Sequence, residues 1–404
     1  MSNVLFVYER KMATTEGVHG IFESDDAKKQ GINARFVNTW KVNGKLLSWS
    51  DTIVFVRNLD LLSQWILLKA KKRGLCIIQF FDDDVLNLPR EAVNRVQYLP
   101  WRKKAIRRGF ESTDVILSSN RLLAEKYAAL TKTKRYATID TTVDPTSLIP
   151  MEKREKEYND NKVKIVFAAG ANHEDTFNKF IVPRLSELVQ RYGRRISFTF
   201  FGVHPDLSQY ENQIEINYIG SMSLNQYRKA IQSGYYDIGL APLESNDFTQ
   251  YKYFNKFIEY TIAGTTGVYS NVLPYTLIIE DKVNGFIAKN TPDGWFSTLC
   301  EAIENGELRK NCYRNAYEQI LSEMRADAVF EKLKRDIPEF NLKHADKQII
   351  SLAGIKARFA IYRSMEVLYL VLEYIRLTGI GGTVDKVKSY MKDHKIAMTE
   401  KLGE

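Results

Sequence analysis

Short apolar segments alternate with helix-like segments along this chain, and the alternation runs through two successive halves. Amphipathic patterns such as Leu61–Lys72 separate the apolar runs of the first half and can face a sheet. Strands that alternate with helices form parallel sheets covered by those helices. The first half is therefore predicted to be an α/β domain, with strands at Asn3–Tyr8, Asn33–Val37, Thr52–Val56, Leu75–Phe80 and Val115–Ser118.

The same alternation starts again at Val163. A charged stretch that is poor in apolar residues, Glu152–Asn161, separates the halves and is interpreted as a linker. A length of 404 residues gives room for two domains, each with its own core. We predict an α/β fold with two Rossmann-like domains facing across a cleft, residues 1–150 and 162–340, joined by residues 151–161. The second half is predicted to open with a strand in the run that starts at Val163 and ends at Gly170. Its further predicted strands are Ser197–Phe201, Ile214–Tyr218, Asp237–Leu240 and Gly267–Ser270.

After about Asn341 the pattern changes to helical segments, which predict an appended helical tail over residues 341–404. The most apolar run of the tail, Val367–Leu377, is interrupted by Glu373 and Arg376. It falls short of the roughly 18 uninterrupted apolar residues of a membrane-spanning helix. The sequence therefore predicts a chain that does not span a bilayer.

The stretch from Asp237 to Gly285 carries the most chemical information. A helix after a buried strand and a polar loop holds Lys252, Lys256 and Glu259 four and three residues apart, so these side chains lie near one face. Lysines neutralise phosphate groups, and a fixed carboxylate accepts hydrogen bonds from a sugar diol. Such folds bind ligands at the carboxyl edge of the sheet. The residues predict a nucleotide-sugar pocket, and the alternative is an amphipathic helix with solvated lysines.

The run K-x-x-x-K-x-x-E-Y-x-x-x-G, followed by V-x-S-N-x-x-P-Y and N-G-F, resembles the donor-binding signature of GT-B-fold glycosyltransferases. It is most similar to the retaining enzymes of glycosyltransferase family 4 that build bacterial surface polysaccharides, and the resemblance covers nearly all of residues 1–335. It implies a reaction that retains anomeric configuration and needs no metal or other cofactor. It also implies that Glu259 holds the nucleotide ribose, that Lys252 and Lys256 stabilise the departing diphosphate, and that Asn271, Pro274 and Tyr275 shape the phosphate and sugar site.

The usual family signature has two glutamates separated by seven residues, and the first would fall on Tyr251. This departure leaves the sugar-contacting carboxylate without a direct counterpart. Glu244 and Asp247, in the preceding loop, are the candidates to supply an equivalent group.

A second motif, Gly170-Ala-Asn-His173-Glu-Asp175, follows the first strand of the second half. A glycine there lets the backbone approach a pyrophosphate, and the next helix offers free N–H groups. The motif resembles the G-S-x-x-H-x-x-D loop of many such enzymes, with the aspartate one place early. It makes Gly170 and His173 candidate donor-binding residues, and the alternative is a structural helix cap at Asp175.

Three adjacent carboxylates, Asp82, Asp83 and Asp84, follow a strongly apolar strand. Such a cluster persists with a cation, with basic neighbours or with a task in proton transfer. A metal-dependent D-x-D site is one interpretation, disfavoured because the donor pocket is predicted in the second half. The string FDDDVLNLP instead resembles an acceptor-side segment of GT-B polysaccharide glycosyltransferases, which makes Asp83 a candidate catalytic residue. A structural role, with one aspartate capping a helix and another pairing with Arg57 or Arg90, is equally well supported.

His19 is predicted in the loop after the first strand, between Gly17 and Gly20, which would let the backbone come close to a substrate. It is a candidate to hydrogen-bond the transferred sugar or the acceptor. The alternative is a loop histidine without a function.

The segment Trp101–Arg108 gathers five cations around an aromatic residue. It predicts a basic helix face with Trp101 as an interfacial anchor for anionic lipid or a lipid-linked acceptor, and the alternative is a solvated face. The tail adds four cations among apolar residues. Three placements suit it: on a membrane, against the N-terminal half, or at an oligomer interface. The four tail cations are Lys356, Arg358, Arg363 and Arg376.

A net charge of +9 favours an anionic partner of some kind. Three cysteines without paired spacing, and no apolar signal segment before the first strand, predict a reducing cytoplasm. The aromatic residues do not form a stacking platform, so nucleic-acid binding is not predicted. We expect a cytoplasmic, membrane-associated glycosyltransferase with a nucleotide-sugar donor and a polysaccharide or lipid-linked acceptor. The alternatives are a nucleotide-sugar 2-epimerase of similar fold and a noncatalytic scaffold that binds the nucleotide sugar.

Overall fold

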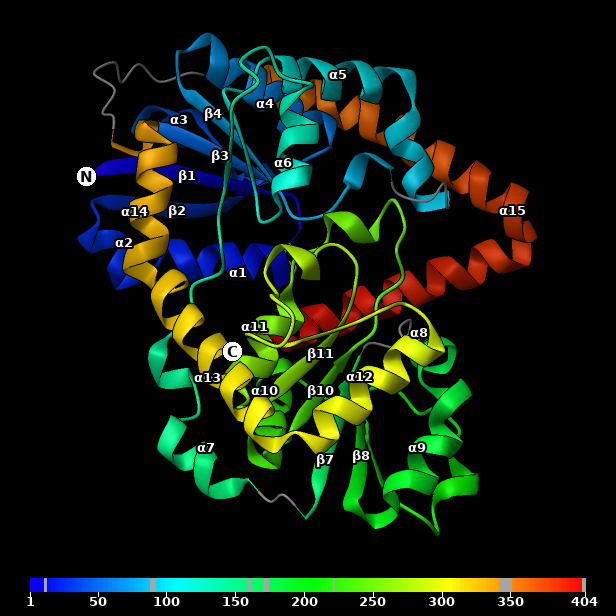
Figure 1. Cartoon of the computed structure of the whole chain (residues 1–404). Coiled ribbons are helices and arrows are strands. Elements are labelled where there is room, and N and C mark those ends of the chain that lie inside the picture. The colour runs from blue at the N-terminus through cyan, green and yellow to red at the C-terminus, as the bar shows by residue number, and fades with distance from the viewer. Residues whose placement is uncertain are drawn as a thin grey trace. The chain divides into compact units, whose positions relative to one another are not determined.

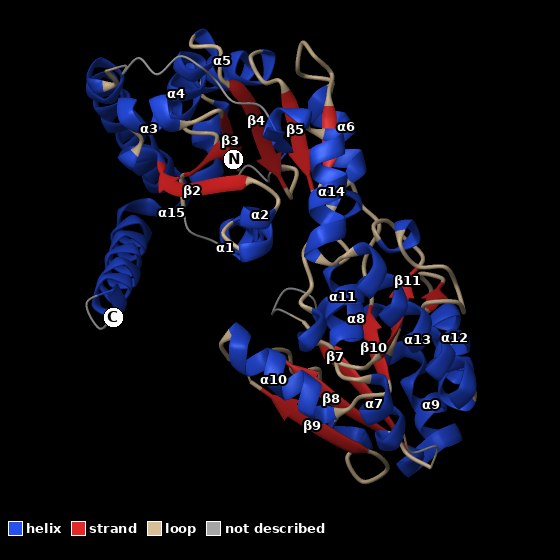
Figure 2. Cartoon of the chain, turned by 90° about the vertical axis from the view of Figure 1, so that its left-hand side faces the viewer, coloured by secondary structure: helices blue, strands red, loops and turns tan. Residues whose placement is uncertain are grey.

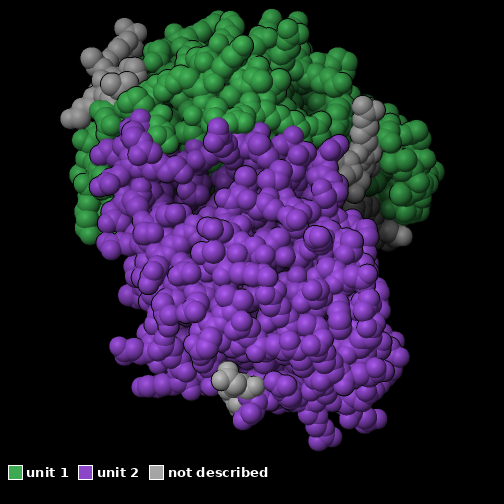
Figure 3. Space-filling model, viewed as in Figure 1, with its two compact units in different colours: residues 1–118, 123–137, 336–404 green, residues 119–122, 138–335 purple. Residues whose placement is uncertain are grey.

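The computed structural model describes residues 1–10, 13–87, 92–158, 161–169, 174–220, 222–341 and 351–401. The chain forms two compact units (Figure 3): unit 1 comprises residues 1–118, 123–137 and 336–404, and unit 2 comprises residues 119–122 and 138–335. Each unit contains one six-stranded sheet with helices on both faces (Figures 1 and 2). This confirms the predicted α/β class with two Rossmann-like domains and a helical tail.

The sheet of unit 1 has the strand order β2-β1-β3-β4-β5-β6. Its described pairings are parallel; Leu5 of β1, for example, lies between Arg35 of β2 and Ile53 of β3. The strands are β1 Ser2–Tyr8, β2 Ile32–Asn38, β3 Thr52–Val56, β4 Cys76–Phe81, β5 Val115–Ser118 and β6 Tyr136–Thr138. The helices of the first half are α1 Ala13–Phe22, α2 Asp25–Lys29, α3 Gly44–Trp49, α4 Leu61–Lys72, α5 Pro100–Glu111 and α6 Arg121–Ala128.

The sheet of unit 2 has the order β12-β11-β10-β7-β8-β9, so the strand order reverses between β7 and β10. Its strands are β7 Val163–Ala168, β8 Ile196–Phe201, β9 Glu215–Ile219, β10 Ile238–Ala241, β11 Thr266–Ser270 and β12 Phe286–Ala288. Its helices are α7 Met151–Glu157, α8 Glu174–Phe180, α9 Leu185–Tyr192, α10 Leu224–Gly234, α11 Asn255–Ile262, α12 Pro292–Glu304, α13 Gly306–Glu323 and α14 Ala326–Asp336.

Alternate residues of β7 pack on opposite faces of this sheet, as the two-residue period of a strand requires. Ile165 and Phe167 belong to the core that includes residues of α8, α9 and α12. Val166 and Ala168 belong to the core that includes residues of α10, α11 and α13. Burial on both faces explains why β7 has a nearly continuous apolar sequence.

The charged stretch interpreted as a linker contains α7, which is packed against unit 2. Arg154 is fully buried, and its guanidinium pairs with Asp237 at 2.9 Å. The same group donates to the main-chain oxygens of Gly264 and Tyr236. A single buried arginine therefore ties α7 to the segments that precede β10 and β11.

The tail forms α15, Ala353–Lys401, whose backbone leaves the helical conformation at Gly379. The inner face of α15 packs on unit 1: Phe359 joins the core beside α4, and Tyr362 contacts Trp65 and Trp101. By length and composition, the segment Ala353–Val384 is apolar enough to cross a membrane, with a mean hydropathy of 1.3.

Contact with α15 corrects the predicted basic face on α5. Arg102 is buried and forms two hydrogen bonds to Glu366 of α15, at 2.6 and 2.8 Å. Trp101 faces Tyr362 and is not an exposed anchor. The exposed cations of α5 are Lys103, Lys104, Arg107 and Arg108.

Candidate functional site

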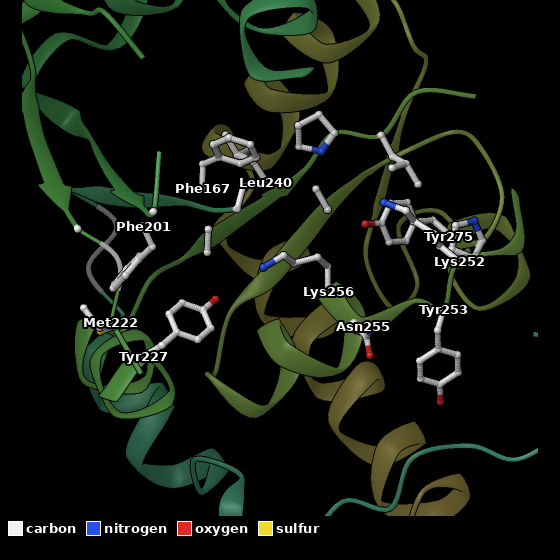
Figure 4. Close-up of a pocket in the computed structure, with 18 residues that line it drawn as sticks. Phe167, Phe201, Met222, Tyr227, Leu240, Lys252, Tyr253, Asn255, Lys256 and Tyr275 are labelled. Carbon is white, nitrogen blue, oxygen red and sulfur yellow. The ribbon is translucent and has the colours of Figure 1, made fainter. Parts of the chain in front are cut away.

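A cavity of about 430 Å³ lies in unit 2, at the carboxyl ends of its central strands (Figure 4). Ala168 and Ala169 after β7 and Ala241 and Pro242 after β10 line it, at the point where the strand order reverses. The crevice at such a point is where open α/β sheets bind ligands. The topology alone therefore makes this cavity the first candidate for a functional site.

Positive charge converges on the cavity from the start of α11. Lys252, Asn255 and Lys256 all line it, and Asn255 is the first residue of the helix. Lys252 lies three residues before the helix in extended backbone, which corrects the prediction that one helix carries Lys252, Lys256 and Glu259. Among the described residues, no side chain caps this first turn. Uncapped N–H groups and the helix dipole favour an anion at this end of the helix. The two lysines add full charges, so the cavity suits a phosphate or diphosphate group.

Glu259 lies one turn behind Lys256 and holds it in place. Lys256 Nζ donates to Glu259 Oε1 at 2.5 Å, and the hydroxyl of Tyr227 donates to the same oxygen. Burial, together with the charge of Glu259, raises the pKa of Tyr227 well above its usual range, so the phenol remains a donor. Lys256 Nζ also lies 5.9 Å from the Tyr227 ring and 5.5 Å from the Tyr260 ring, within cation–π range. The Lys256 ammonium is thus held by one carboxylate and two aromatic faces.

A glycine at the end of β8 brings the backbone close to the cavity. Gly202 has φ +74°, in the left-handed region, and a Cβ there would lie 2.6 Å from the carbonyl oxygen of Ala169. Only glycine meets both conditions without displacing the backbone. Gly220, which also lines the cavity, has open space around its Cβ position.

The predicted donor residues divide into three groups. Lys252, Lys256, Pro274 and Tyr275 line the cavity, and Glu259 contacts two of its lining residues. Asn271 and Glu244 are not among the lining residues: Asn271 is exposed and Glu244 pairs with Lys179 at 2.5 Å. Gly170 and His173 lie outside the described residues.

His19 is not in a loop, which corrects its predicted position. It lies in α1, where it pairs with Glu23 at 3.0 Å and packs its ring edge against Phe36. The flanking Gly17 and Gly20 are helical positions with open space around them. The helix forms because Val18, Ile21 and Phe22 are buried against unit 1, and this packing outweighs the low helix propensity of two glycines.

The three aspartates after β4 are each compensated by neighbouring groups. Asp82 and Asp83 share the Arg57 guanidinium at 2.8 and 3.0 Å. Asp84 is buried and accepts hydrogen bonds from Lys126 and Tyr127. These contacts agree with the structural interpretation. Within the described ranges, no group of three or more histidine, cysteine or acidic side chains is placed to hold a metal ion.

Unit 1 has a polar cavity of about 370 Å³ at the carboxyl ends of β1, β2 and β3. Glu9, Asp60 and Arg102 line it together with the exposed Trp40 and with Arg363 of α15. The main-chain N–H groups of Leu59 and Asp60 donate to Glu9 at 2.5 and 2.6 Å. Burial, reinforced by the nearby charge of Asp60, raises the pKa of Glu9 to about 8.

Several site residues were not predicted from the sequence. Tyr227 reaches Glu259 from α10, a helix that starts at the capping box of Ser223 and Gln226. A capping box marks the start of a helix but gives no indication of what that helix packs against. Gly202 had a detectable signal, since a glycine directly after an apolar strand often marks close approach of the backbone.

No protein-family model and no curated protein sequence matches this chain. Solved structures do match. The crystal structure of Anabaena Alr3699/HepE in complex with UDP has a TM-score of 0.56 at 9% identity, covering 84% of this chain and all of that one. Sucrose-phosphate synthase from Thermosynechococcus elongatus has a TM-score of 0.54 at 9% identity, over 83% and 98% of the two chains. A glycosyltransferase from Rickettsia africae has a TM-score of 0.52 at 16% identity, over 85% and 99%.

These matches extend over both units and nearly the whole length of each solved chain. They confirm the GT-B fold class, and at identities of 9 to 16% they concern the fold. About one sixth of this chain is not covered by the match to Alr3699/HepE.

Proposed function

We propose that the chain is a glycosyltransferase that moves a sugar from a nucleoside diphosphate sugar to a polysaccharide or lipid-linked acceptor. The observation that carries the proposal is the cavity at the switch point of unit 2, with Lys252, Lys256 and the uncapped start of α11 on one side. The GT-B fold adds support, because solved proteins of this fold include sucrose-phosphate synthase and a glycosyltransferase.

The chemical step breaks the bond between the anomeric carbon and the diphosphate oxygen, and the oxygen of an acceptor hydroxyl forms the new bond to that carbon. The proton of the hydroxyl passes to the departing diphosphate, so the products are the glycosylated acceptor and the nucleoside diphosphate. Negative charge grows on the departing diphosphate. That charge develops beside Lys252, Lys256 and the N–H groups at the start of α11. Because the folded chain holds these groups in place before the reaction starts, their electrostatic stabilisation of the transition state is expected to be the largest contribution to the rate. The protein's own cations can supply this stabilisation, and the resemblance to retaining enzymes favours retention at the anomeric carbon.

The donor is proposed to be a UDP-sugar, with the diphosphate at the two lysines and the ribose at Glu259. Alr3699/HepE, of the same fold, has been solved with UDP-glucose. In the described part of the chain, both hydrogen bonds to Glu259 use Oε1, which leaves Oε2 to accept from a ribose hydroxyl. Glu244 pairs with Lys179 and does not line the cavity. Tyr275 or Asn255, which do line it, is proposed to contact the sugar in place of the second glutamate of the family signature.

The acceptor is proposed to bind unit 1. Its polar cavity brings the carboxyl group of Glu9, whose raised pKa keeps it protonated near neutral pH, beside the exposed indole of Trp40; a carboxyl group that both donates and accepts hydrogen bonds and an aromatic face are groups that can hold a sugar ring. The three cysteines are buried free thiols, which supports a reducing cytoplasm as the place of action. Asp83 is proposed to orient Arg57 in this unit, and His19 has no proposed role.

The test is thermal stabilisation by UDP-, GDP-, dTDP- and CMP-sugars, first with chelator and then with magnesium or manganese. A ligand at about 100 times its Kd adds about 2.7 kcal/mol of stability, which shifts the melting temperature measurably. A shift with UDP-sugars in chelator is the expected result. A shift that requires metal would overturn the metal-independent mechanism, and the absence of any shift would overturn the donor site.

Product analysis separates transfer from the rival activities. Incubation with donor alone should return the unchanged sugar apart from slow hydrolysis, whereas a 2-epimerase would convert it to a second nucleotide sugar. Membrane extract or oligosaccharide fractions added as acceptors should then release UDP. Tight donor binding without UDP release in any fraction would favour a scaffold.

A further inference from the structure

Helix α15 carries a stripe of exposed apolar side chains along its outer face. The stripe consists of residues four and three positions apart, which places them on one side of the helix. Their side chains are between 37% and 65% exposed. The residues are Ile361, Met365, Leu368, Leu372 and Ile375. Contiguous exposed apolar surface of this kind marks an interaction site.

The opposite face of the same helix is anchored to unit 1. Phe359 is buried in the core and stacks edge-on against Trp40, and Lys356 donates to the Trp40 carbonyl at 2.7 Å. Glu366 is fully buried against Arg102, and Glu373 pairs with Arg95 at 3.2 Å. These contacts fix the rotation of the helix about its axis, so the apolar stripe is held away from the body of unit 1.

Charge is distributed unequally between these two faces. Between residues 353 and 384, Glu366 and Glu373 are the only acidic residues, and both belong to the anchored face. Arg358 and Arg376 are exposed beside the apolar stripe, and Arg376 pairs with Glu373 at 3.1 Å, whereas Arg363 pairs with Glu366 at 3.5 Å and lies on the anchored side. Helix α5 contacts α15 through the hydrogen bond from Arg102 to Glu366, and α5 has four exposed cations of its own. An apolar stripe with two exposed arginines beside it, on a helix whose two glutamates are both turned toward unit 1, is complementary to an anionic lipid surface.

We propose that the outer face of α15 binds the surface of an anionic membrane, with the apolar stripe in the headgroup region and the arginines at lipid phosphates. The helix lies on the bilayer and does not cross it. Crossing would pull Glu366 and Glu373 away from Arg102 and Arg95 and carry both carboxylates toward hydrocarbon. The backbone at Gly379, with φ 72° and ψ 177°, also breaks the helix within the apolar segment.

A second copy of the chain is the less suitable occupant of this face. Pairing two identical faces would bury Arg358 and Arg376 beside both stripes, and the described part of α15 has no exposed carboxylate to pair with Arg358 of either copy. The proposal rests on α15 and unit 1, so it stands or falls independently of the donor cavity in unit 2.

The test is flotation of the full chain with vesicles of neutral lipid alone and of neutral lipid with about 30% anionic lipid. The triple variant Ile361→Ser, Leu368→Ser, Leu372→Ser removes the three most exposed of the five apolar side chains in the stripe and leaves the anchored face intact. The matched control is Leu277→Ser, Val283→Ser, which removes exposed apolar side chains of unit 2. Melting curves of all three proteins check that they are equally folded.

We expect the wild-type chain to float with anionic vesicles and to be partly released by salt at about 1 M, which screens the arginines. The triple variant should bind at least about tenfold more weakly because it loses three apolar side chains at the interface. The control should bind like the wild type. The proposal is overturned if the wild type does not float or if the triple variant floats equally well. Failure of alkaline carbonate to extract the bound protein would also overturn it, because it would indicate a helix that crosses the bilayer. A wild type that is a dimer without lipid, together with a monomeric triple variant, would overturn it in favour of a second copy of the chain.

Discussion

Lys256 is the residue on which the proposed chemistry depends most. Glu259, Tyr227 and Tyr260 hold its ammonium group. Lys256 and Tyr227 are both among the residues that line the cavity in Figure 4. Lys256→Ala should lower kcat by about 100-fold, with a smaller change in the KM of the donor, because the charge matters most when the diphosphate departs. Steady-state kinetics would measure both constants. A kcat within about twofold of wild type would remove the assignment.

Glu259 should show the opposite kinetic pattern. Glu259→Ala removes a carboxylate that is proposed to bind ribose equally in the ground state and the transition state, so the KM of the donor should rise by about tenfold or more. Tyr227→Phe is the matched control, since it removes only the hydroxyl that donates to Glu259. Tyr227→Phe leaves the Glu259 carboxylate in place, so an equal rise in KM for both variants would contradict a direct hydrogen bond between Glu259 and the ribose.

Gly202 and Gly220 form a natural pair of variants within one cavity. Gly202→Ala places a Cβ at a left-handed φ and 2.6 Å from the Ala169 oxygen, so it should cost about 1 to 3 kcal/mol of unfolding free energy and weaken donor binding. Gly220→Ala meets open space and should change neither quantity measurably. Urea unfolding and a donor titration of the two variants would check this, and equal effects would contradict the argument.

Glu9 predicts how stability depends on pH. Its pKa is raised from 4.5 to about 8, so between these values the folded chain holds a proton that the unfolded chain has released. Stability should therefore decrease as pH rises through this window, by at most about 1.4 kcal/mol per pH unit for this group. Asp60, whose pKa is also raised by burial, contributes with the same sign. Urea unfolding at about pH 6 and pH 8 should show the decrease, and Glu9→Gln should reduce it; a flat or rising wild-type profile would contradict it.

At the scale of elements, α7 depends on one buried ion pair. Arg154→Ala leaves Asp237 buried without its cation and removes bonds to two main-chain oxygens, so unit 2 should lose about 3 to 5 kcal/mol of unfolding free energy. Lys153→Ala, at an exposed neighbour on the same helix, should stay within about 0.5 kcal/mol of wild type. Chemical denaturation of the two variants would measure the difference, and similar losses would show that helix propensity, not the ion pair, holds α7.

The sequence predicted most of the strands and only part of the site, for physical reasons. Ten strands were found because each contains a run of several apolar residues next to a turn or helix signal; β6 and β12 were missed because three residues at the edge of a sheet are too few to give a periodic pattern. Lys252, Lys256, Pro274 and Tyr275 were found because one contiguous signature carries them. Tyr227 was missed because its position beside Glu259 depends on how α10 packs, which no local pattern encodes. His19 was misplaced because burial of α1 outweighed its glycines.

At the scale of the whole molecule, the two units should respond separately to ligands. A UDP-sugar that binds the cavity of unit 2 should slow amide exchange in β7, β10 and α11, whose residues line that cavity. The core of unit 1 around β1 and α4 contains none of those residues and should exchange as before. Hydrogen exchange with mass spectrometry would measure this, and equal protection of both sheets would contradict separate responses.

The return of the tail to unit 1 has a consequence for synthesis on the ribosome. Arg102 emerges 264 residues before its partner Glu366, and at about 5 to 20 residues per second this interval lasts roughly 13 to 50 s. Unit 2 is complete within that interval, whereas the nascent N-terminal sheet still lacks Leu352 and Phe359 from its core. The unit that begins first is therefore finished last. A stop codon or a stall before residue 350 would release a chain with a hydrophobic gap beside α4 and a buried arginine without its carboxylate, which is a natural substrate for chaperones and proteases.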